Sequence, residues 1–550
     1  MGTTRRAVLA GGLTGLGACG TVRVPGVLSG KDAASFGQGV ASGDPQTESV
    51  VIWTRAAAAG TVRGTAEVAE DEGFSRVAWS APFEAGPGTD HTVKLVADGL
   101  APGGRYHYRF RVGETASPTG RTRTLPERAE RARFAVMSCS NYPFGYFNAY
   151  DHAARQDLDA VIHLGDMVYE YGPDGYGGEV GARLGRAHVP ARETVSLTDY
   201  RLRHRQYKTD PASRAMHAAH PLIAVWDDHE TANDSWKGGA QNHGPGEGGW
   251  AARRRAAMQA YYEYVPVRNP RPGEGREAFW RSFTWGGLLT LAAIETRLTA
   301  RTEQLAYERV LPELTSPEAV ERWRREVLED GGREMMGAEQ ATYVAQALAG
   351  SAARGEPWRL LANQVIMARV TAPDLAAAIT EAEVARIERE WPPIRDYVAF
   401  AALGLPTNLD AWDGYPAARE RFYQAARDAG ARDLVVLTGD THEAWANRLT
   451  DADGQPMGVE IGATGVTSPG SAAYLGERAE TFARLLAETN EDVVWQGVGV
   501  NGYVDLTLDH EGGRADHVAV STVLSEDYEA RVVRSFALVR RDGTVTFEGA

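Results

Sequence analysis

The sequence predicts an α/β fold preceded by a small antiparallel β sandwich. Residues 36–125 contain short strand-like segments separated by Gly, Pro and Asp turns, without a long helical pattern. After residue 133, apolar runs of strand length alternate with longer stretches of helical periodicity. The chain has 550 residues, 43% of them hydrophobic, so it can bury a large core and we expect two domains.

The first predicted domain spans residues 36–125. Its strand signals are SVVIWTR (49–55), TVKLVADGL (92–100) and YHYRFRVG (106–113). Short strands at this spacing, each bounded by turn residues, are typical of an antiparallel sandwich. We interpret the charged segment TRTLPERAERAR (122–133) as the linker to the second domain.

The second predicted domain spans residues 133–530 and supplies both strands and helices. Its strand-like runs are RFAVMS (133–138), AVIHLG (160–165), LIAVWD (222–227), LLTLAAIE (288–295) and DLVVLTG (433–439). Helical periodicity is found at 250–264, 338–349 and 416–429. Two Gly-rich segments, 174–190 and 236–249, are expected to be loops that line or cover a functional site.

Four short blocks carry most of the chemistry-bearing residues. They are SCSN (138–141), HLGDMVYEYG (163–172), VWDDHETAND (225–234) and LTGDTHEAW (437–445). Three of the four follow an apolar run of strand type, so their polar residues fall where strands of an α/β sheet end and ligands usually bind. We therefore expect the four blocks to form one site.

One set of donors in these blocks suits a transition metal. Cys139, Tyr169 and His442 offer thiolate, phenolate and imidazole, which are soft to borderline ligands. Tyr169 lies three residues after Asp166, so a loop turning into a helix would aim both side chains into one pocket. Asp166 could then bind this metal and a second one.

A second set of donors suits a hard cation such as calcium, magnesium or manganese. Asp227, Asp228 and Asp440 offer only carboxylate oxygen. In GDTH, an extended backbone would place Asp440 and His442 on one face, because alternate residues of a strand point the same way. One short segment could thus serve two metals.

Each block also has a purely structural interpretation. GDxxY or DxH alone is more often a helix cap or a turn, and Cys139 alone is more often a small buried hydrophobe. WDDHE is harder to explain in this way, because three adjacent ionisable groups are costly to bury unpaired. Taken together, the blocks favour a metal site.

In these residues the sequence resembles the PhoD-like alkaline phosphatases, a family whose site is similar to that of the purple acid phosphatases. FGQGVASGDPQTESVVIWTR (36–55) resembles the opening of the family's N-terminal domain, and the four blocks appear in family order. The resemblance implies that the second domain is the four-layer αββα sandwich of the metallophosphoesterases.

The resemblance also implies a two-metal site and assigns ligands to each metal. An Fe(III) ion would be held by Cys139, Asp166, Tyr169 and His442. Calcium (Ca2+) would be held by Asp166, Asp228 and Asp440, with Asp227 as a further ligand.

Two further residues are predicted to act on the substrate. The resemblance places His229 beside the phosphate, where it would orient the ester or protonate the leaving oxygen. Arg297, in IETR (294–297), could clamp a phosphate with two hydrogen bonds, and an exposed ion pair is the alternative. The family more often has Asp before Thr-Arg, so Glu295 is not carried over as a site residue.

These residues predict a phosphoric ester hydrolase in which a metal-bound hydroxide or oxide attacks phosphorus in line. The expected substrates are small phosphate monoesters, diesters or both. One alternative is a phosphodiesterase or phospholipase D-type diester hydrolase, and a rival mechanism uses Ser138 or Ser140 as a covalent nucleophile. A noncatalytic phosphate- or metal-binding lipoprotein is the alternative of another class, but it does not explain a complete ligand set.

Residues 1–19 resemble a twin-arginine export signal, with Arg5 and Arg6 before a short apolar run. The run ends in a lipobox-like segment in which Cys19 would be lipidated, and a chance cysteine is the alternative. We therefore expect a periplasmic or extracellular protein whose membrane tether, if any, is a lipid on Cys19. Only Cys19 and Cys139 are present, so no intramolecular disulfide is expected after processing.

The net charge of −15 argues against specific binding of nucleic acid or polyphosphate. No second apolar stretch is long enough to span a membrane. A monomer acting on small phosphate esters is the expected form.

Overall fold

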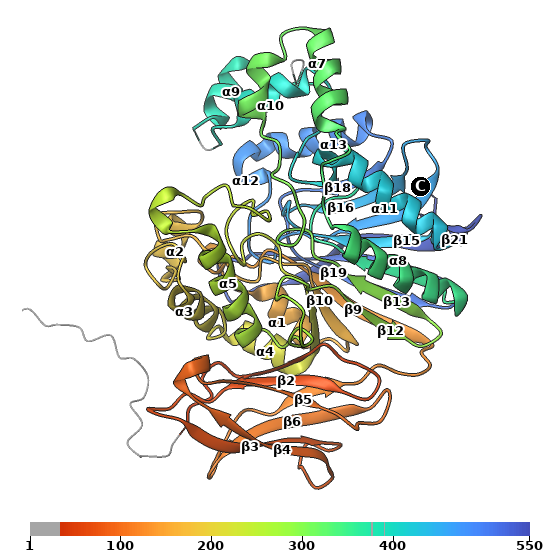
Figure 1. Ribbon diagram of the computed structural model, residues 1–550. Coiled ribbons are helices and arrows are strands. Elements are labelled where there is room, and N and C mark those ends of the chain that lie inside the picture. The colour runs from red at the N-terminus through yellow and green to blue at the C-terminus, as the bar shows by residue number, and fades with distance from the viewer. Residues whose placement is uncertain (1–33, 376–377, 390, 550) are drawn as a thin grey trace, which may run out of the picture.

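The computed structural model describes residues 34–375, 378–389 and 391–549. Within these ranges the strands form three sheets, of ten, seven and five strands, with helices around the two larger ones (Figure 1). The predicted export signal and Cys19 lie outside the described residues. No described helix has both the length and the apolar composition needed to cross a membrane.

The ten-stranded sheet has the order β22-β21-β20-β19-β9-β10-β11-β1-β2-β5. Its strands are β1 (Val40–Gly43), β2 (Val50–Arg55), β5 (Thr92–Ala97), β9 (Arg131–Met137), β10 (Ala160–His163), β11 (Pro221–Ala224), β19 (Asn501–Asp509), β20 (Gly513–Val520), β21 (Ala530–Arg541) and β22 (Thr544–Phe547). β9, β10 and β11 are parallel neighbours, with Val161 opposite Ala135 on one side and Leu222 on the other. Their carboxyl ends therefore lie along one edge.

The seven-stranded sheet has the order β12-β13-β14-β15-β17-β16-β18. Its strands are β12 (Arg281–Trp285), β13 (Leu289–Ala293), β14 (Trp358–Ala362), β15 (Leu434–Thr438), β16 (Ala444–Thr450), β17 (Pro456–Gly462) and β18 (Val493–Gly497). β13, β14, β15 and β17 are parallel. A single parallel bridge between Ser138 and Gly465 joins the segments that follow β9 and β17.

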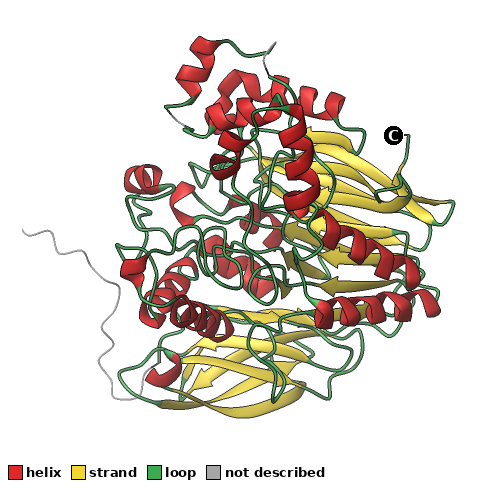
Figure 2. Ribbon diagram, turned by 45° about the horizontal axis from the view of Figure 1, so that its top comes forward, coloured by secondary structure: helices red, strands yellow, loops and turns green. Residues whose placement is uncertain are grey.

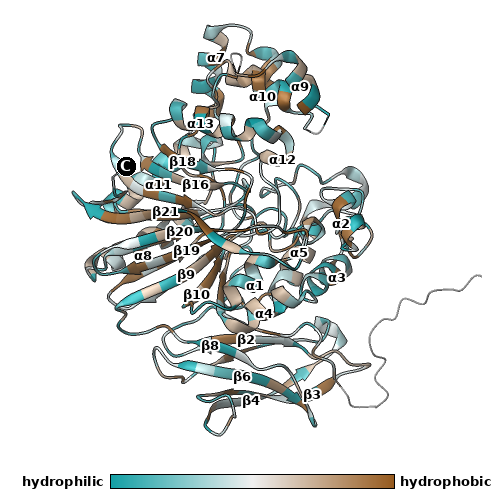
Figure 3. Cartoon of the chain, turned by 180° about the vertical axis from the view of Figure 1, so that it is seen from behind, coloured by the Kyte–Doolittle hydropathy of each residue, from teal (hydrophilic) through white to brown (hydrophobic). Residues whose placement is uncertain are grey.

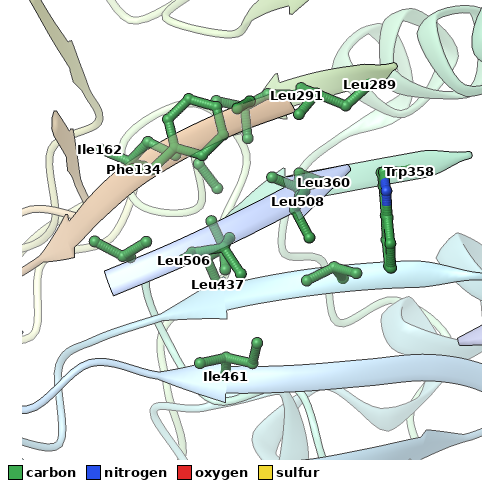
Figure 4. Close-up of a cluster of buried hydrophobic side chains, with 14 of the residues drawn as sticks. Phe134, Ile162, Leu289, Leu291, Trp358, Leu360, Leu437, Ile461, Leu506 and Leu508 are labelled. Carbon is green, nitrogen blue, oxygen red and sulfur yellow. The ribbon is translucent and has the colours of Figure 1, made fainter. Parts of the chain in front are cut away.

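The two larger sheets bury an apolar cluster between them (Figure 4). Phe134 and Ile162 of the ten-stranded sheet lie in it with Leu360 and Leu437 of the seven-stranded sheet. Burial of each side chain of this kind stabilises the folded state by about 1.5–3 kcal/mol relative to leaving the side chain exposed. β10, which Figure 3 colours as largely hydrophobic, is buried along its whole length because its other face is covered by helices.

Helices cover the outer faces of both sheets (Figure 1). α1 (Asn148–Ala154), α4 (Pro211–Ala219) and α5 (Trp250–Tyr264) pack on the ten-stranded sheet. α8 (Ala338–Ala353), α11 (Pro416–Asp428) and α13 (Ala479–Thr489) pack on the seven-stranded sheet. The helices predicted at 250–264, 338–349 and 416–429 are confirmed as α5, α8 and α11.

The remaining helices are short and lie between strands. They are α2 (Gly178–Leu184), α3 (Leu197–Tyr207), α6 (Tyr307–Val310), α7 (Pro317–Trp323), α9 (Glu381–Ile387), α10 (Ile394–Ala401) and α12 (Ala472–Leu475). α7, α9 and α10 form a group at one end of the molecule, next to α12 and α13, and share an apolar cluster with them (Figure 1). The segment 174–190, predicted as a loop, contains α2, because the glycines at both ends adopt left-handed conformations that close a short helix.

The five-stranded sheet packs against β2 and β5 through a cluster that includes Ile52, Val93 and Phe110. Its strands are β3 (Val62–Ala69), β4 (Val77–Ala85), β6 (Arg105–Val112), β7 (Thr115–Ala116) and β8 (Gly120–Arg123). β2, β5 and β6 confirm the three strands predicted in this region.

Residues 36–125 are not separated from the rest of the chain by their hydrogen bonding. β1 pairs in parallel with β11, with Ser42 opposite Pro221, so β1, β2 and β5 extend the ten-stranded sheet. At the other end, β21 and β22 continue this sheet past residue 530. The domain limits 36–125 and 133–530 therefore stay a prediction.

Candidate metal centre

The predicted site residues other than Arg297, which follows β13, lie after the carboxyl ends of four strands. Figure 2 shows loops, in green, gathered between the helices and the sheets. Cys139 follows β9; Asp166 and Tyr169 follow β10; Asp227, Asp228 and His229 follow β11; Asp440 and His442 follow β15. β9, β10 and β11 belong to one sheet and β15 to the other, so the site lies where the two sheets meet.

The ligand atoms form three overlapping groups, and within each group all atoms lie within 4.8 Å of one another. The groups are Cys139, Asp166 and His442; Asp166, Asp228 and His229; and Asp227, Asp228 and Asp440. Asp166 belongs to the first two groups and Asp228 to the last two. The three groups therefore form one continuous cluster, joined through Asp166 and Asp228.

The first group is arranged for a metal that accepts nitrogen and sulfur. His442 Nδ1 donates to the carbonyl oxygen of Pro469 at 3.0 Å, which leaves Nε2 facing the hydroxyl of Tyr169 at 3.4 Å. Burial lowers the pKa of His442 to about 4, so the ring is neutral, the form that binds metals. Burial also raises the pKa of Cys139 and of Tyr169 far above their ordinary values, so a bound cation is needed to ionise them.

Tyr169 is held in place by two hydrogen bonds. Its hydroxyl donates to Asp166 Oδ2 at 3.0 Å and accepts from Ser468 Oγ at 2.8 Å. The sequence interpretation placed Tyr169 and Asp166 in one pocket, and the structure brings them together.

The third group of ligands, which consists only of carboxylates, fits a hard cation. Asp227 Oδ2 and Asp228 Oδ1 are buried and have no hydrogen-bond partner among the described residues. Burial raises the pKa of Asp166 and of Asp440, and neighbouring carboxylates add to the effect. Buried, mutually repelling carboxylates with free oxygens fit a bound cation.

The backbone at four ligands adopts an uncommon conformation. Cys139, Asp166, Asp440 and His442 have φ angles of 58°, 57°, 64° and 61°. Positive φ at residues other than glycine costs on the order of 1–3 kcal/mol each and persists where the surroundings enforce it. The loops are therefore held in place to aim these side chains.

Arg297 lies behind the carboxylates and does not line the cavity next to them. Its side chain is fully buried, and Nε donates to Asp227 Oδ1 at 2.5 Å. The guanidinium also lies 2.7 Å from Asp410, 3.5 Å from Asp440 and 3.7 Å from Asp228. This placement does not match the predicted phosphate clamp, because carboxylates already surround the guanidinium.

Glu295 orients the loop that carries Arg297. Its Oε1 accepts from the backbone N–H of Arg297 at 2.7 Å and of Leu298 at 2.6 Å, and from Trp226 Nε1 at 2.9 Å. A glutamate at this position is therefore a structural residue that supports Arg297.

His229 lies beside Asp166 and Asp228 and lines a cavity. Its Nδ1 is 2.8 Å from Glu170 Oε2, and its ring stacks on Tyr169 with centroids 4.2 Å apart. Burial by itself lowers the pKa of His229, but Asp228, Glu170 and Asp166 together raise the pKa well above its ordinary value. The imidazole is thus arranged to hold a proton that it can donate.

A cavity of about 450 Å³ opens onto these residues. Its polar side is formed by Asp166, Asp228, His229, Asp440 and His442. Asp227 does not line the cavity, since Asp228 and Arg297 lie around it. Such a volume holds a small ester beside the cluster.

Two family models match this chain. One, described as the PhoD-like phosphatase N-terminal domain, matches residues 25–126, and the other, described as PhoD-like phosphatase, matches residues 134–517. The chain belongs to the PhoD-like phosphatase family. It is therefore a phosphoric ester hydrolase, as the sequence predicted.

Two relatives match nearly the whole chain. Alkaline phosphatase D of Bacillus subtilis (strain 168) is 33% identical over 526 residues, which cover 92% of this chain and 81% of that protein. A solved structure described as "Structure of PhoD" superposes with a TM-score of 0.75 at 29% identity and covers 95% of this chain and 94% of its own. The family and the three ligand groups both support metal dependence.

Several site residues were not singled out from the sequence. Glu230 accepts from the backbone N–H groups of Asp166, Met167 and Asp227 at 3.0, 2.5 and 2.8 Å and so joins the loops after β10 and β11. Glu170 supports His229. Both glutamates lie inside the quoted blocks, so the density of acidic residues there was an available signal.

Asp234 and Asp410 complete the acidic surroundings. Asp234 lines the cavity, and burial together with Asp410 and Asp228 raises its pKa to about 7. Asp410 forms ion pairs with Arg297 and Arg301. Asp410 has no sequence signal, because it lies in a loop far from the four blocks.

The serines proposed as nucleophiles lack a base. Ser140 Oγ is 3.2 Å from the carbonyl oxygen of Asp166 and accepts from the Tyr150 hydroxyl at 2.8 Å. Ser138 is fully buried and does not line the cavity. Neither arrangement resembles an activated serine.

Proposed function

We propose that this chain hydrolyses phosphate monoesters, diesters or both at a centre that binds one Fe(III) ion and Ca2+. The observation that carries the proposal is the set of three overlapping ligand groups, joined through Asp166 and Asp228, whose members Asp166, Asp228, His229, Asp440 and His442 line the cavity. When bound, the metals supply the Lewis acidity that activates water and neutralises charge on the phosphoryl oxygens.

The two ligand sets differ in donor chemistry and so favour different metals. Fe(III) would be held by the thiolate, phenolate, imidazole and carboxylate of Cys139, Tyr169, His442 and Asp166. Ca2+ would be held by the carboxylates of Asp166, Asp227, Asp228 and Asp440. The buried oxygens of Asp227 and Asp228 that lack a hydrogen-bond partner among the described residues support the second assignment.

His229 acts as the proton donor. Its Nδ1 is held by Glu170 at 2.8 Å, so Nε2 is the nitrogen left to face the substrate. In this position it donates a proton to the leaving oxygen of the ester. Glu170 keeps the ring oriented and stabilises its charge.

Arg297 is a positioning residue. Its guanidinium lies among Asp227, Asp228, Asp410 and Asp440 and offsets their mutual repulsion. It keeps these carboxylates close enough to share a cation without touching the substrate.

We also interpret the two packed sheets and their outer helices as the four-layer αββα sandwich of the metallophosphoesterases, with the packed sheets of residues 36–125 as the N-terminal β sandwich. Export by the twin-arginine route and a lipid on Cys19 stay predictions from the sequence.

The test combines metal analysis with turnover. Purified protein loaded with iron and calcium should release product from a chromogenic monoester, a chromogenic diester or both. Glu170→Gln should lower the rate by weakening the charge on His229, while iron and calcium contents stay unchanged. Activity with neither ester, in protein that contains both metals, would overturn the proposal.

A further inference from the structure

The cavity is lined by apolar side chains as well as by the predicted ligands. This apolar wall is formed by Leu375, Trp391, Ile394, Tyr397, Leu475 and Phe482. They come from the segment before α9, from α10 and its approach, and from α12 and α13, which lie together at one end of the molecule (Figure 1). The wall therefore belongs to a different part of the chain from the four ligand blocks.

The apolar wall is a packed structure and not a chance gathering of mobile side chains. Tyr397 packs edge-on against Phe482, with ring centroids 5.6 Å apart, and against Trp391 at 5.7 Å. Tyr397, Ile394 and Leu475 are buried in the cluster shared by these helices. Aromatic and aliphatic side chains held in this way form a fixed surface for an apolar group.

The charge of the cavity restricts what can bind beside the phosphate. Among the described residues that line it there is no Lys or Arg. Asp234 adds a further carboxylate to the same lining. If the alcohol part of the substrate carried another phosphate or carboxylate, that group would find no Lys or Arg among the described residues of the cavity lining. The proposed metal ions would already be occupied by the phosphate that reacts.

One polar atom of the apolar wall is available to a ligand. The hydroxyl of Tyr397 is buried and has no hydrogen-bond partner among the described residues. A buried hydroxyl of this kind is costly unless a ligand or water bonds it. The wall thus offers an apolar surface together with the hydroxyl of Tyr397 as a hydrogen-bonding group.

We propose that the alcohol part of the substrate is apolar and uncharged, an aryl group or an alkyl chain that lies on the wall while the phosphate lies on the ligand cluster. This inference rests on the proposed function and deepens it.

The test uses phosphate esters of methyl, butyl and hexyl alcohols, together with glycerol phosphate, on the metal-loaded full chain. These alcohols leave with similar intrinsic ease, so differences in kcat/KM report binding to the wall. If the enzyme turns over only diesters, the matching methyl diesters are used. We expect kcat/KM to rise roughly 10- to 100-fold from methyl to hexyl and to be lowest for glycerol phosphate.

Phe482→Ala removes part of the wall and should lower the ratio of hexyl to methyl kcat/KM by roughly 10-fold. Phe482→Leu keeps an apolar surface and should retain most of the ratio, which controls for a folding defect. Trp79→Ala, in the five-stranded sheet, shortens an aromatic residue remote from the cavity and should leave the ratio unchanged.

A wild-type rate that does not depend on chain length, or an unchanged ratio in Phe482→Ala, overturns the inference and leaves the proposed function standing. Turnover of none of the esters overturns both.

Discussion

At the scale of single residues, the site depends on charges placed where water is excluded. Asp166, Asp227 and Asp228 are each at most 3% exposed, and Arg297 is fully buried beside them. In such surroundings an unpaired charge is strongly destabilising, so each ion must have a partner. Arg297 is one such partner, and the proposed cations would be the others.

Tyr169→Phe tests the predicted iron ligand. The change removes one hydroxyl and keeps the packing volume, so the fold should be retained. If Tyr169 binds Fe(III), its phenolate should give a charge-transfer band that colours the wild type, and the variant should lose this band and most of its bound iron. Visible absorption and elemental analysis measure both. A wild type without iron but with full activity would contradict the assignment.

Arg297→Met tests the role of Arg297. Removing the guanidinium leaves Asp227, Asp410 and Asp440 without their buried cation, and we expect the free energy of unfolding to fall by about 3–5 kcal/mol in EGTA. Calcium should restore part of this loss, because it takes over the charge. Denaturant unfolding with and without calcium measures the effect.

Arg297→Lys is the matched control, since it keeps the charge but not the planar fork, and should recover part of the stability. A phosphate clamp predicts a different result, in which Arg297→Met raises KM and leaves the stability of the metal-free protein unchanged.

At the scale of elements, the site depends on loops that approach one another closely. Gly165, between β10 and Asp166, has a φ of 108°. A Cβ at this position would lie 2.4 Å from Cβ of Asp227, in the loop after β11. The glycine before Asp166 is therefore required both by its backbone conformation and by the contact between two loops.

Gly165→Ala should push the loops after β10 and β11 apart. We expect activity to fall at least 100-fold, since a displacement of about 1 Å costs this much in a positioned site, and calcium to bind more weakly. Gly60→Ala is the matched control and should keep full activity, because a Cβ at residue 60 would meet no atom within 4 Å beyond its chain neighbours. Turnover and calcium titration of both variants check this, and normal values for Gly165→Ala would contradict it.

At the scale of the whole molecule, the N-terminal strands and the helices around the site form one packed unit. Lys208, at the end of α3, is buried with its ammonium group 4.7 Å from the ring of Trp53 in β2. Burial lowers the pKa of Lys208 from 10.5 to about 7. A titrating group therefore lies at the junction between the two parts of the chain.

Lys208→Met should stabilise the protein in a pH-dependent way. Between about pH 7 and 10.5 the unfolded chain binds a proton that the folded chain does not, so the free energy of unfolding of the wild type rises with pH across this window. Below pH 7 the folded chain carries the buried ammonium at full cost. The gain from Lys208→Met should thus be largest below pH 7 and disappear above about pH 10.5.

Chemical denaturation across this pH range measures the difference between the two proteins. Lys237→Met, at an exposed lysine, is the control and should change stability little at any pH. A gain from Lys208→Met that does not vary with pH would show that the effect is one of packing and not of charge.

The amino-acid sequence by itself determined the features that are encoded in short segments. The strands β9, β10, β11, β13 and β15, the helices α5, α8 and α11, and the gathering of the four ligand blocks were all predicted. Strand and helix periodicity, and donors at strand ends, are local patterns, because they depend on neighbours within a few residues.

Only the tertiary structure decided the features that depend on contacts between distant segments. Arg297 and Asp227 are 70 positions apart, and nothing near either residue indicates that one neutralises the other. β1 pairs with β11, although Ser42 and its partner Pro221 are far apart in the sequence. The apolar wall combines residues of α10, α12 and α13 with a cavity floor built elsewhere, because burial of apolar surface is set by the packing of the whole chain and not by any one segment.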